Sequence, residues 1–179
     1  MCIIFNMKKI IIFSILSVFI AGSYLLCDEV PTKTQIQPEY PYLPDDVKAL
    51  VDKTFSINPT ERVEAVYRLG LLGEKAEKAS PFLIRMLDDN IPVFCRYNGD
   101  GAWTTTGKEA AKALARIGKP SLKYLIPVIE NKHPYISINP YMERNIILFL
   151  TEISGENFGD DISKWLNWIK TRYSGENIP

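Results

Sequence analysis

From Asp45 onward, apolar and polar positions alternate with the period of an α-helix. One apolar frame occurs three times: an adjacent pair, two residues, a leucine, two further residues, then leucine or isoleucine. The three copies are Ala65, Val66, Leu69 and Leu72; Ala110, Ala111, Leu114 and Ile117; and Ile146, Ile147, Leu150 and Ile153. A glycine follows each copy, at Gly73, Gly118 and Gly155, as is typical of a left-handed helix C-cap.

Each copy is followed by a second, shorter apolar frame, which predicts a repeated helix pair. The shorter frames are Leu83, Met86 and Leu87; Leu125, Val128 and Ile129; and Trp165, Trp168 and Ile169. Single helix pairs cannot bury both apolar faces, so the pairs are expected to stack around one shared core. The predicted fold is therefore all-α: a right-handed α-solenoid of about three helix pairs, occupying residues 45–172.

Three local features add detail to this fold. A helix over residues 45–56 is expected to cap one end of the stack. Asn58 is a predicted N-cap, with Pro59 at the first helical position. The alanine-rich second copy allows two helices to approach closely, and Trp165 and Trp168 read as core residues rather than as a sugar-binding platform.

A polar, aromatic segment interrupts the repeat at about residues 92–106. "PVFCRY" and "AWTTT" are β-prone, and "NGDG" between them favours a tight turn, so the segment is predicted to be an inserted β-hairpin. A calcium loop is excluded, because its first and twelfth positions would be Arg96 and Gly107 instead of carboxylates.

Two interpretations of the hairpin remain open. Insertions in repeat proteins often lie on the binding face, and aromatic residues and arginine dominate interface hot spots. Arg96, Tyr97 and Trp103 are accordingly the candidate protein-binding residues. Alternatively, Phe94 and Trp103 fold back over a gap in the stack; Arg96 and Tyr97 are expected to point outward in either case.

The N-terminus predicts export. Lys8 and Lys9 precede an apolar run up to Leu26, and "AGS" supplies the small residues that a signal peptidase accepts. Residues 1–26 are interpreted as a signal peptide or a retained membrane anchor. Cys27 is a possible lipidation site. The expected location is periplasmic, membrane-anchored or extracellular.

A proline-rich segment, 27–44, separates this region from the repeats. It is interpreted as a linker, or alternatively as a strap that lies over the domain through Tyr40 and Tyr42. Residues 173–179 are expected to form a disordered tail.

Composition limits the possible functions. The chain has 21 basic and 21 acidic residues, so its net charge argues against nucleic-acid binding. It has one histidine, His133, and three cysteines without metal-ligand spacing. Nucleophile-elbow, P-loop and dinucleotide-binding motifs are lacking. We therefore expect no catalytic, cofactor-binding or metal-binding residues, an unidentified protein partner, and membrane contact only through the N-terminal segment.

Three segments carry a family resemblance. "ERVEAVYRLGLLGEKAEKASPFLIRMLDD" and "GKEAAKALARIGKPSLKYLIPVIENKHP" resemble HEAT repeats, in particular the short bacterial armadillo-type form called PBS-lyase HEAT-like. "ISGENFGDDISKWLNWIK" is similar to an ending found on such bacterial proteins, so the resemblance covers about residues 58–170. Because solenoids present extended surfaces and no catalytic motif competes, we expect a non-catalytic protein-binding or scaffold module. The alternative, which the resemblance alone implies, is an accessory or lyase-like enzyme of tetrapyrrole (bilin) attachment.

Overall fold

The computed structural model describes residues 43–97 and 100–173. The predicted signal segment, Cys27 and almost all of the predicted linker, with Tyr40 and Tyr42, lie outside these residues, as does the tail from residue 174. The described part is mostly helical with one small antiparallel sheet, which confirms the all-α fold class and the hairpin. In chain order its elements are α2 (Asp45–Lys53), α3 (Pro59–Leu71), the 3-10 helix η2 (Gly73–Ala79), α4 (Ser80–Met86), β1 (Pro92–Tyr97), β2 (Asp100–Thr105), α5 (Thr106–Ile117), the 3-10 helix η3 (Lys119–Ser121), α6 (Leu122–Ile129), α7 (Pro140–Ser154) and α8 (Ile162–Tyr173).

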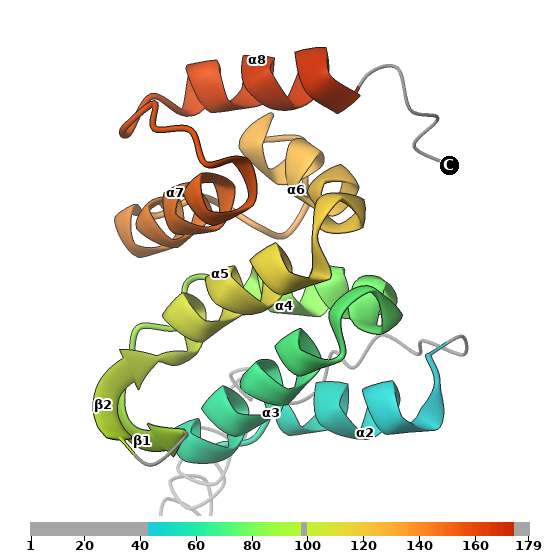
Figure 1. Cartoon of the computed structure of the whole chain (residues 1–179), viewed down its shortest axis with the longest axis vertical. Helices are drawn as coiled ribbons and strands as arrows, with labels where there is room; N and C mark the ends of the chain where they lie inside the picture. Colours follow the sequence, from blue (N-terminus) through green and yellow to red (C-terminus); the bar gives the residue numbers. More distant parts are fainter. Residues whose placement is uncertain (1–42, 98–99, 174–179) are drawn as a thin grey trace, which may run out of the picture. The chain divides into compact units, whose positions relative to one another are not determined.

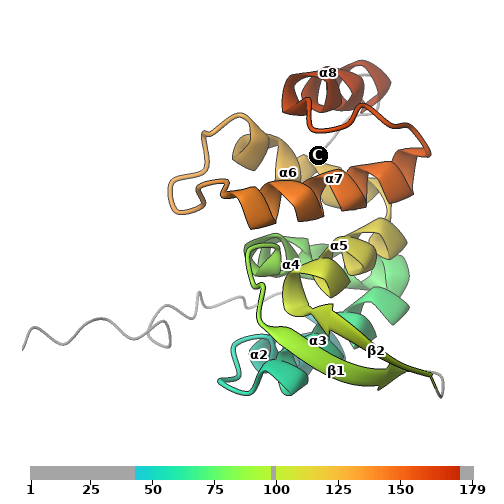
Figure 2. The same ribbon diagram turned by 90° about the vertical axis from the view of Figure 1, so that its left-hand side faces the viewer.

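The helices are arranged in two layers (Figures 1 and 2). In the first layer α3 packs against α5, and α5 packs against α7; in the second, α4 contacts α6 and α6 contacts α8. The layers meet most extensively where α4 lies against α5. At one end α2 packs against α3. Neighbouring helix pairs thus follow one another in space in the order of the sequence.

The repeated frame forms the core, as the periodicity predicted. Ala65, Val66, Leu69, Ala110, Ala111, Leu114, Ile117, Ile146 and Leu150 are buried, and Leu72, Ile147 and Ile153 are partly buried against them. Trp165 of the shorter frame is completely buried and Trp168 partly so. The interpretation of Trp165 as a core residue is therefore confirmed.

Side-chain caps fix where the three first-layer helices begin, and at α5 the Thr105 hydroxyl accepts a hydrogen bond of 3.1 Å from the Lys108 amide. The Asn58 side chain accepts a hydrogen bond of 3.0 Å from the Thr60 amide, as predicted. Asn139 caps α7 in the same way, accepting from the amides of Tyr141 and Met142. In both cases a proline occupies the first helical position, where its lack of an amide donor costs no hydrogen bond.

Two helix boundaries differ from the prediction. α2 ends at Lys53 instead of continuing to residue 56, and the Thr54 hydroxyl there donates to the Val51 carbonyl at 2.7 Å. α8 continues through Tyr173, one residue into the predicted tail. Of the three predicted left-handed glycine caps, Gly155 caps α7 in that conformation (φ 71°, ψ 1°), and Gly73, directly after α3 and its C-cap residue, also has a left-handed φ of 56°. Gly118 ends α5 with a different conformation (φ 89°, ψ −157°).

α3 and α5 approach closely at a glycine–alanine contact. A Cβ atom added at Gly70 would lie only 2.9 Å from the Cα atom of Ala113. Beside this contact the Arg116 guanidinium lies 5.3 Å from the centre of the Tyr67 ring, a cation–π interaction between the two helices. The close approach expected for the alanine-rich copy is present.

Polar contacts from three helices hold the connection between α4 and β1. The Arg62 Nε atom of α3 donates to Asp89 at 2.7 Å, and both side chains are largely buried. The amide of Gly107 in α5 donates to the Asp89 carbonyl at 2.8 Å. The Asn145 side chain of α7 donates to the Leu87 carbonyl, also at 2.8 Å. These contacts fix the point from which the hairpin leaves the helices.

The last helix is tied to the second layer through Glu130, which follows α6. Its carboxylate forms ion pairs with Lys132 at 2.8 Å and with Lys170 of α8. Hydrogen bonds from the Lys132 and Lys170 ammonium groups lower the pKa of Glu130 to about 2.

Candidate protein-binding surface

The hairpin lies on α3, with its smaller side chains toward the helix. Val93 and Cys95 of β1 are buried and form a separate apolar cluster with Val63 of α3. The register pairs Phe94 with Trp103 and Tyr97 with Asp100. The strands Pro92–Tyr97 and Asp100–Thr105 agree with the predicted insertion at about 92–106.

A buried carboxylate anchors the hairpin to α5. The Thr104 hydroxyl of β2 donates to Glu109 at 2.7 Å, and the Lys112 ammonium group binds the same carboxylate oxygen at 3.0 Å. Glu109 is only 4% exposed, so its charge is compensated inside the protein. The hairpin is therefore fixed at its base by both α3 and α5.

The outer face of the hairpin presents two aromatic rings and an arginine. Trp103 is 69% exposed and Phe94 is 46% exposed. Their ring centres lie 5.5 Å apart in an edge-to-face arrangement, and the Arg96 guanidinium lies 5.9 Å from the Phe94 ring. The Phe94 ring also covers Gly101, where an added Cβ atom would lie 2.3 Å from it.

Of the two interpretations of the hairpin, the one in which Phe94 and Trp103 fold back over a gap in the stack is wrong, because both side chains are exposed. Successive residues of a strand point to opposite faces, and Val93, Cys95 and Thr104 occupy the face against the helices. The exposure of Arg96 was predicted correctly. The side chain of Tyr97 lies outside the described part of the structure, so its outward orientation stays a prediction.

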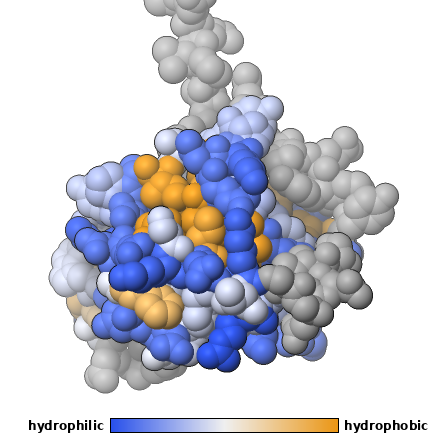
Figure 3. Space-filling model, turned by 90° about the horizontal axis from the view of Figure 1, so that it is seen from above, coloured by the Kyte–Doolittle hydropathy of each residue, from blue (hydrophilic) through white to orange (hydrophobic). Residues whose placement is uncertain are grey.

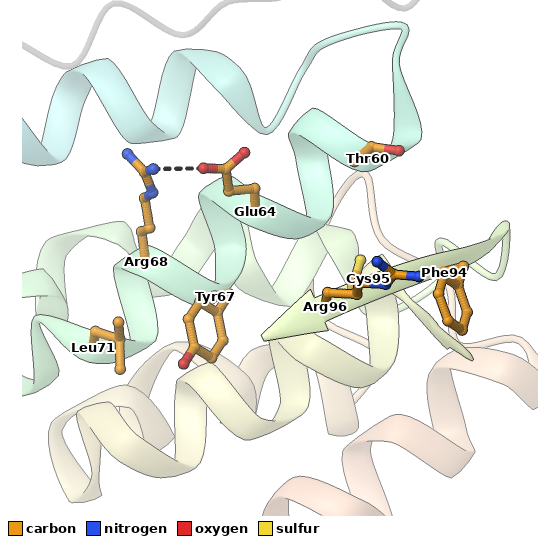
Figure 4. Close-up of a pocket in the computed structure, with 8 residues that line it drawn as sticks. All are labelled: Thr60, Glu64, Tyr67, Arg68, Leu71, Phe94, Cys95 and Arg96. Carbon is orange, nitrogen blue, oxygen red and sulfur yellow. Dashed lines mark ion pairs between the residues drawn. The ribbon is translucent and has the colours of Figure 1, made fainter. Parts of the chain in front are cut away.

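A groove runs between the hairpin and α3 (Figure 4). It has a volume of about 530 Å³ and is lined by Thr60, Glu64, Tyr67, Arg68 and Leu71 of α3 and by Phe94, Cys95 and Arg96 of β1. The α3 residues follow one face of the helix, and Leu71 is 62% exposed. The sequence did not predict this groove, because its two walls are distant along the chain.

The groove carries one positive charge without an opposite charge. Glu64 and Arg68 pair with each other at 2.5 Å, as the dashed line in Figure 4 marks. In contrast, none of the described carboxylates forms an ion pair with Arg96. The free positive charge of the groove therefore lies on β1.

The main chain of β1 has an open edge. Hydrogen-bonded and non-hydrogen-bonded pairs alternate in an antiparallel ladder. The pair that closes a hairpin with a two-residue connection, here Tyr97 and Asp100, is hydrogen-bonded, so the pairs formed by Arg96 and by Phe94 are not. By this alternation, the main-chain groups of Phe94 and Arg96 point away from β2. In residues 43–97 and 100–173 these groups find no other hydrogen-bond partner.

A second exposed apolar surface lies at the opposite end of the helices. Figure 3 looks onto the end that carries α8 and shows apolar surface near the middle of that face, bordered by hydrophilic residues. The last helices also contribute partly buried apolar residues to the core, among them Ile153 and Ile162. The largest exposed aromatic side chains of the hairpin, by comparison, stand beside a groove.

The described part of the chain contains one histidine, His133, and one cysteine, Cys95. No group of three or more His, Cys, Asp or Glu side chains in residues 43–97 and 100–173 is placed to hold a metal ion. His133 lies in the connection between α6 and α7, where its Nδ1 atom accepts from the Tyr135 amide at 3.3 Å. Cys95 is a free, buried thiol. In residues 43–97 and 100–173, each helix is too short or too polar to span a lipid bilayer.

Comparison with protein-family models, with curated proteins and with solved structures gives no match to this chain.

Proposed function

We propose that the chain is an exported, non-catalytic protein-binding module built on a HEAT-like right-handed α-solenoid, with the outer face of the hairpin as its principal contact surface. One observation carries the proposal: Trp103 and Phe94 are exposed side by side next to Arg96, on a hairpin anchored at its base. The candidate contact residues are Arg96, Tyr97 and Trp103.

The physical argument concerns hot spots. Exposed tryptophan and arginine side chains that lose their water on binding contribute most of the affinity of many interfaces. Trp103 and Phe94 already contact each other, and Thr104 is tied to Glu109 beneath them. A partner therefore binds side chains whose freedom is already restricted, which lowers the entropic cost of association.

The order of helix contacts supports the solenoid part of the proposal. Each first-layer helix packs on the next one, and the second layer repeats this order. Proteins of this architecture present extended surfaces for binding other proteins. The chemistry of the described side chains adds no candidate for a lyase reaction, so the tetrapyrrole alternative rests on resemblance alone.

Export is proposed from the N-terminal segment. If residues 1–26 are retained as an anchor, the predicted linker 27–44 would hold the helical domain outside the membrane. If they are cleaved, the domain would be released. Cell fractionation with N-terminal sequencing tests this directly. An acylated Cys27 would support a lipoprotein, whereas a cytoplasmic chain that retains residues 7–23 would contradict export.

Site-specific photo-crosslinking tests the binding surface. A photoreactive residue placed at Trp103 in the native host is expected to capture a discrete protein partner. The matched control places it at Tyr135, which is 90% exposed on the connection between α6 and α7. Equal capture at both positions, or none at Trp103, would contradict the proposal. A stable coloured complex with bilin or haem would favour the tetrapyrrole alternative instead.

A further inference from the structure

We propose that the groove between α3 and β1 binds an extended segment of a partner protein as an additional strand on β1, with an acidic side chain of that segment against Arg96. This inference rests on the proposed protein-binding function and specifies the chemistry of the partner. Four properties of the groove support it.

The first property is the open main-chain edge. Phe94 and Arg96 direct their main-chain donors and acceptors away from β2, and both residues line the groove. An extended peptide supplies the complementary groups at the strand spacing, as in other cases of strand addition. A helix placed in the groove would leave the main-chain groups of β1 buried without partners, which is unfavourable.

The second property is the length of the groove. β1 lines it with three consecutive residues, Phe94, Cys95 and Arg96. At about 3.3 Å per residue, an added strand would pair with this wall over roughly three residues. The volume of about 530 Å³ is that of a site for a short segment, not for a folded domain.

The third property is the charge. Arg96 lacks an acidic partner among the described residues, while the nearby Arg68 is neutralised by Glu64. A carboxylate on the added strand would form a charge-assisted hydrogen bond with the Arg96 guanidinium. The chemistry of the groove thus favours an acidic residue at one position.

The fourth property fixes the neighbouring positions. Directly paired residues of adjacent strands share a face. In the added strand, the residue paired with Phe94 therefore lies two residues from the acidic residue paired with Arg96, and their side chains share one face. An apolar residue is expected there, next to the exposed ring of Phe94. The side chain between them points toward α3, where Tyr67 and the exposed Leu71 favour another apolar residue.

The test uses a fluorescent synthetic peptide, Thr-Val-Glu-Val-Phe-Val-Thr, and the full-length chain. Binding is measured by fluorescence anisotropy. Two further peptides carry N-methyl groups. The first is methylated on the amides of Glu and Phe, and the second on the amides of the valines that flank these two residues. Because only alternate amides of an added strand face β1, one methylation pattern should abolish binding and the other should leave it nearly unchanged. Loss with both patterns, or with neither, would overturn the proposal.

A charge exchange tests the contact with Arg96. Arg96→Glu should weaken binding of the peptide at least about tenfold, and replacing the glutamate of the peptide by lysine should restore it. Arg85→Glu, at an exposed position of α4, is the matched control and should leave the affinity within about twofold. Circular dichroism of both variants checks that the fold is intact. Failure of the exchange would overturn the assignment of the acidic position.

The outcomes separate this inference from the proposed function. Capture of a partner at Trp103 without peptide binding would retain the protein-binding function and reject the added strand. Alternate-amide dependence together with charge exchange would support the added strand. If the chain forms a dimer that does not bind the peptide, the occupant of the groove is a second copy of the chain, and the proposed strand from a partner protein is rejected.

Discussion

The contact between Gly70 and Ala113 makes a quantitative prediction about how closely α3 and α5 must pack. In Gly70→Ala the new methyl group would lie 2.9 Å from the Ala113 Cα atom and 3.0 Å from its Cβ atom. Ordinary contacts between such carbon atoms are about 3.5–4.0 Å. The nearest atom belongs to the main chain of a buried helix. The clash can therefore be relieved only if the two helices move apart, because rotation of a side chain does not move a main-chain atom.

Two opposing effects set the magnitude. Overpacking of a well-packed core costs typically 1–3 kcal/mol. Alanine is a better helix former than glycine by about 0.8–1.0 kcal/mol, and this offsets part of the cost. Because the closest contact is with a main-chain atom, the overpacking cost should lie in the upper part of this range, about 2–3 kcal/mol. We therefore expect Gly70→Ala to lower the free energy of unfolding by about 1–2 kcal/mol, which corresponds to a decrease in Tm on the order of 5 °C.

The control moves the methyl group to the other helix. Gly70→Ala combined with Ala113→Gly keeps the composition and removes the 3.0 Å contact with the Ala113 Cβ atom, but it leaves the 2.9 Å contact with the Cα atom. The double variant should therefore be more stable than the sum of the two single changes predicts, without returning to the wild-type stability. Urea unfolding of the wild type, both single variants and the double variant gives the coupling energy between the two sites. An unchanged or increased stability of Gly70→Ala, or additive effects in the double variant, would refute the reasoning.

Three further predictions concern stability. Trp103→Ala should change the free energy of unfolding by less than about 1 kcal/mol because the side chain is 69% exposed, whereas Leu114→Ala in the core should cost about 2–5 kcal/mol. A large loss of stability in Trp103→Ala, measured by urea unfolding, would contradict the outward orientation of the side chain. Asp89→Asn should cost roughly 3 kcal/mol because it leaves the largely buried guanidinium of Arg62 without its charge partner, while the control Glu64→Gln, in an exposed pair, should cost at most about 1 kcal/mol in the same assay. The pKa of Glu130 is lowered from 4.5 to about 2, chiefly by Lys132 and then by Lys170, so its contribution to stability is present above pH 4.5 and is lost as the pH falls through about 2; the difference in Tm between wild type and Glu130→Gln should shrink over this window, and a constant difference would argue against the ion pairs.

The sequence predicted those parts of the fold that depend on local periodicity. The repeated frame identified the buried residues of α3, α5 and α7, and Asn58 with Pro59 identified the start of α3. The strands of the hairpin were predictable from β-prone segments around a turn. These signals come from residues close together in the chain.

The orientation of the hairpin was not predictable in the same way. A strand that alternates Val93 and Cys95 with Phe94 and Arg96 has an apolar residue on each face, so a shift of one residue would exchange the faces without a clear penalty in the pattern. The choice depends on what α3 offers, namely a small apolar site at Val63. The groove and the Arg62–Asp89 ion pair likewise join residues far apart in sequence.

The hydrogen bond from Asn145 to the Leu87 carbonyl has a consequence for cooperative unfolding. In a stack of repeats that contact only their nearest neighbours, the end units can open without the others. Here Asn145 of α7 reaches past α5 to the Leu87 carbonyl at the end of α4. Opening α7 would therefore break a hydrogen bond with a helix pair that is not its nearest neighbour. Native-state hydrogen exchange is expected to show α3, α5 and α7 opening as one unit, with α8 exchanging earlier. In Asn145→Ala, exchange in α7 should separate from that in α3, and the stack would lose part of its all-or-none character.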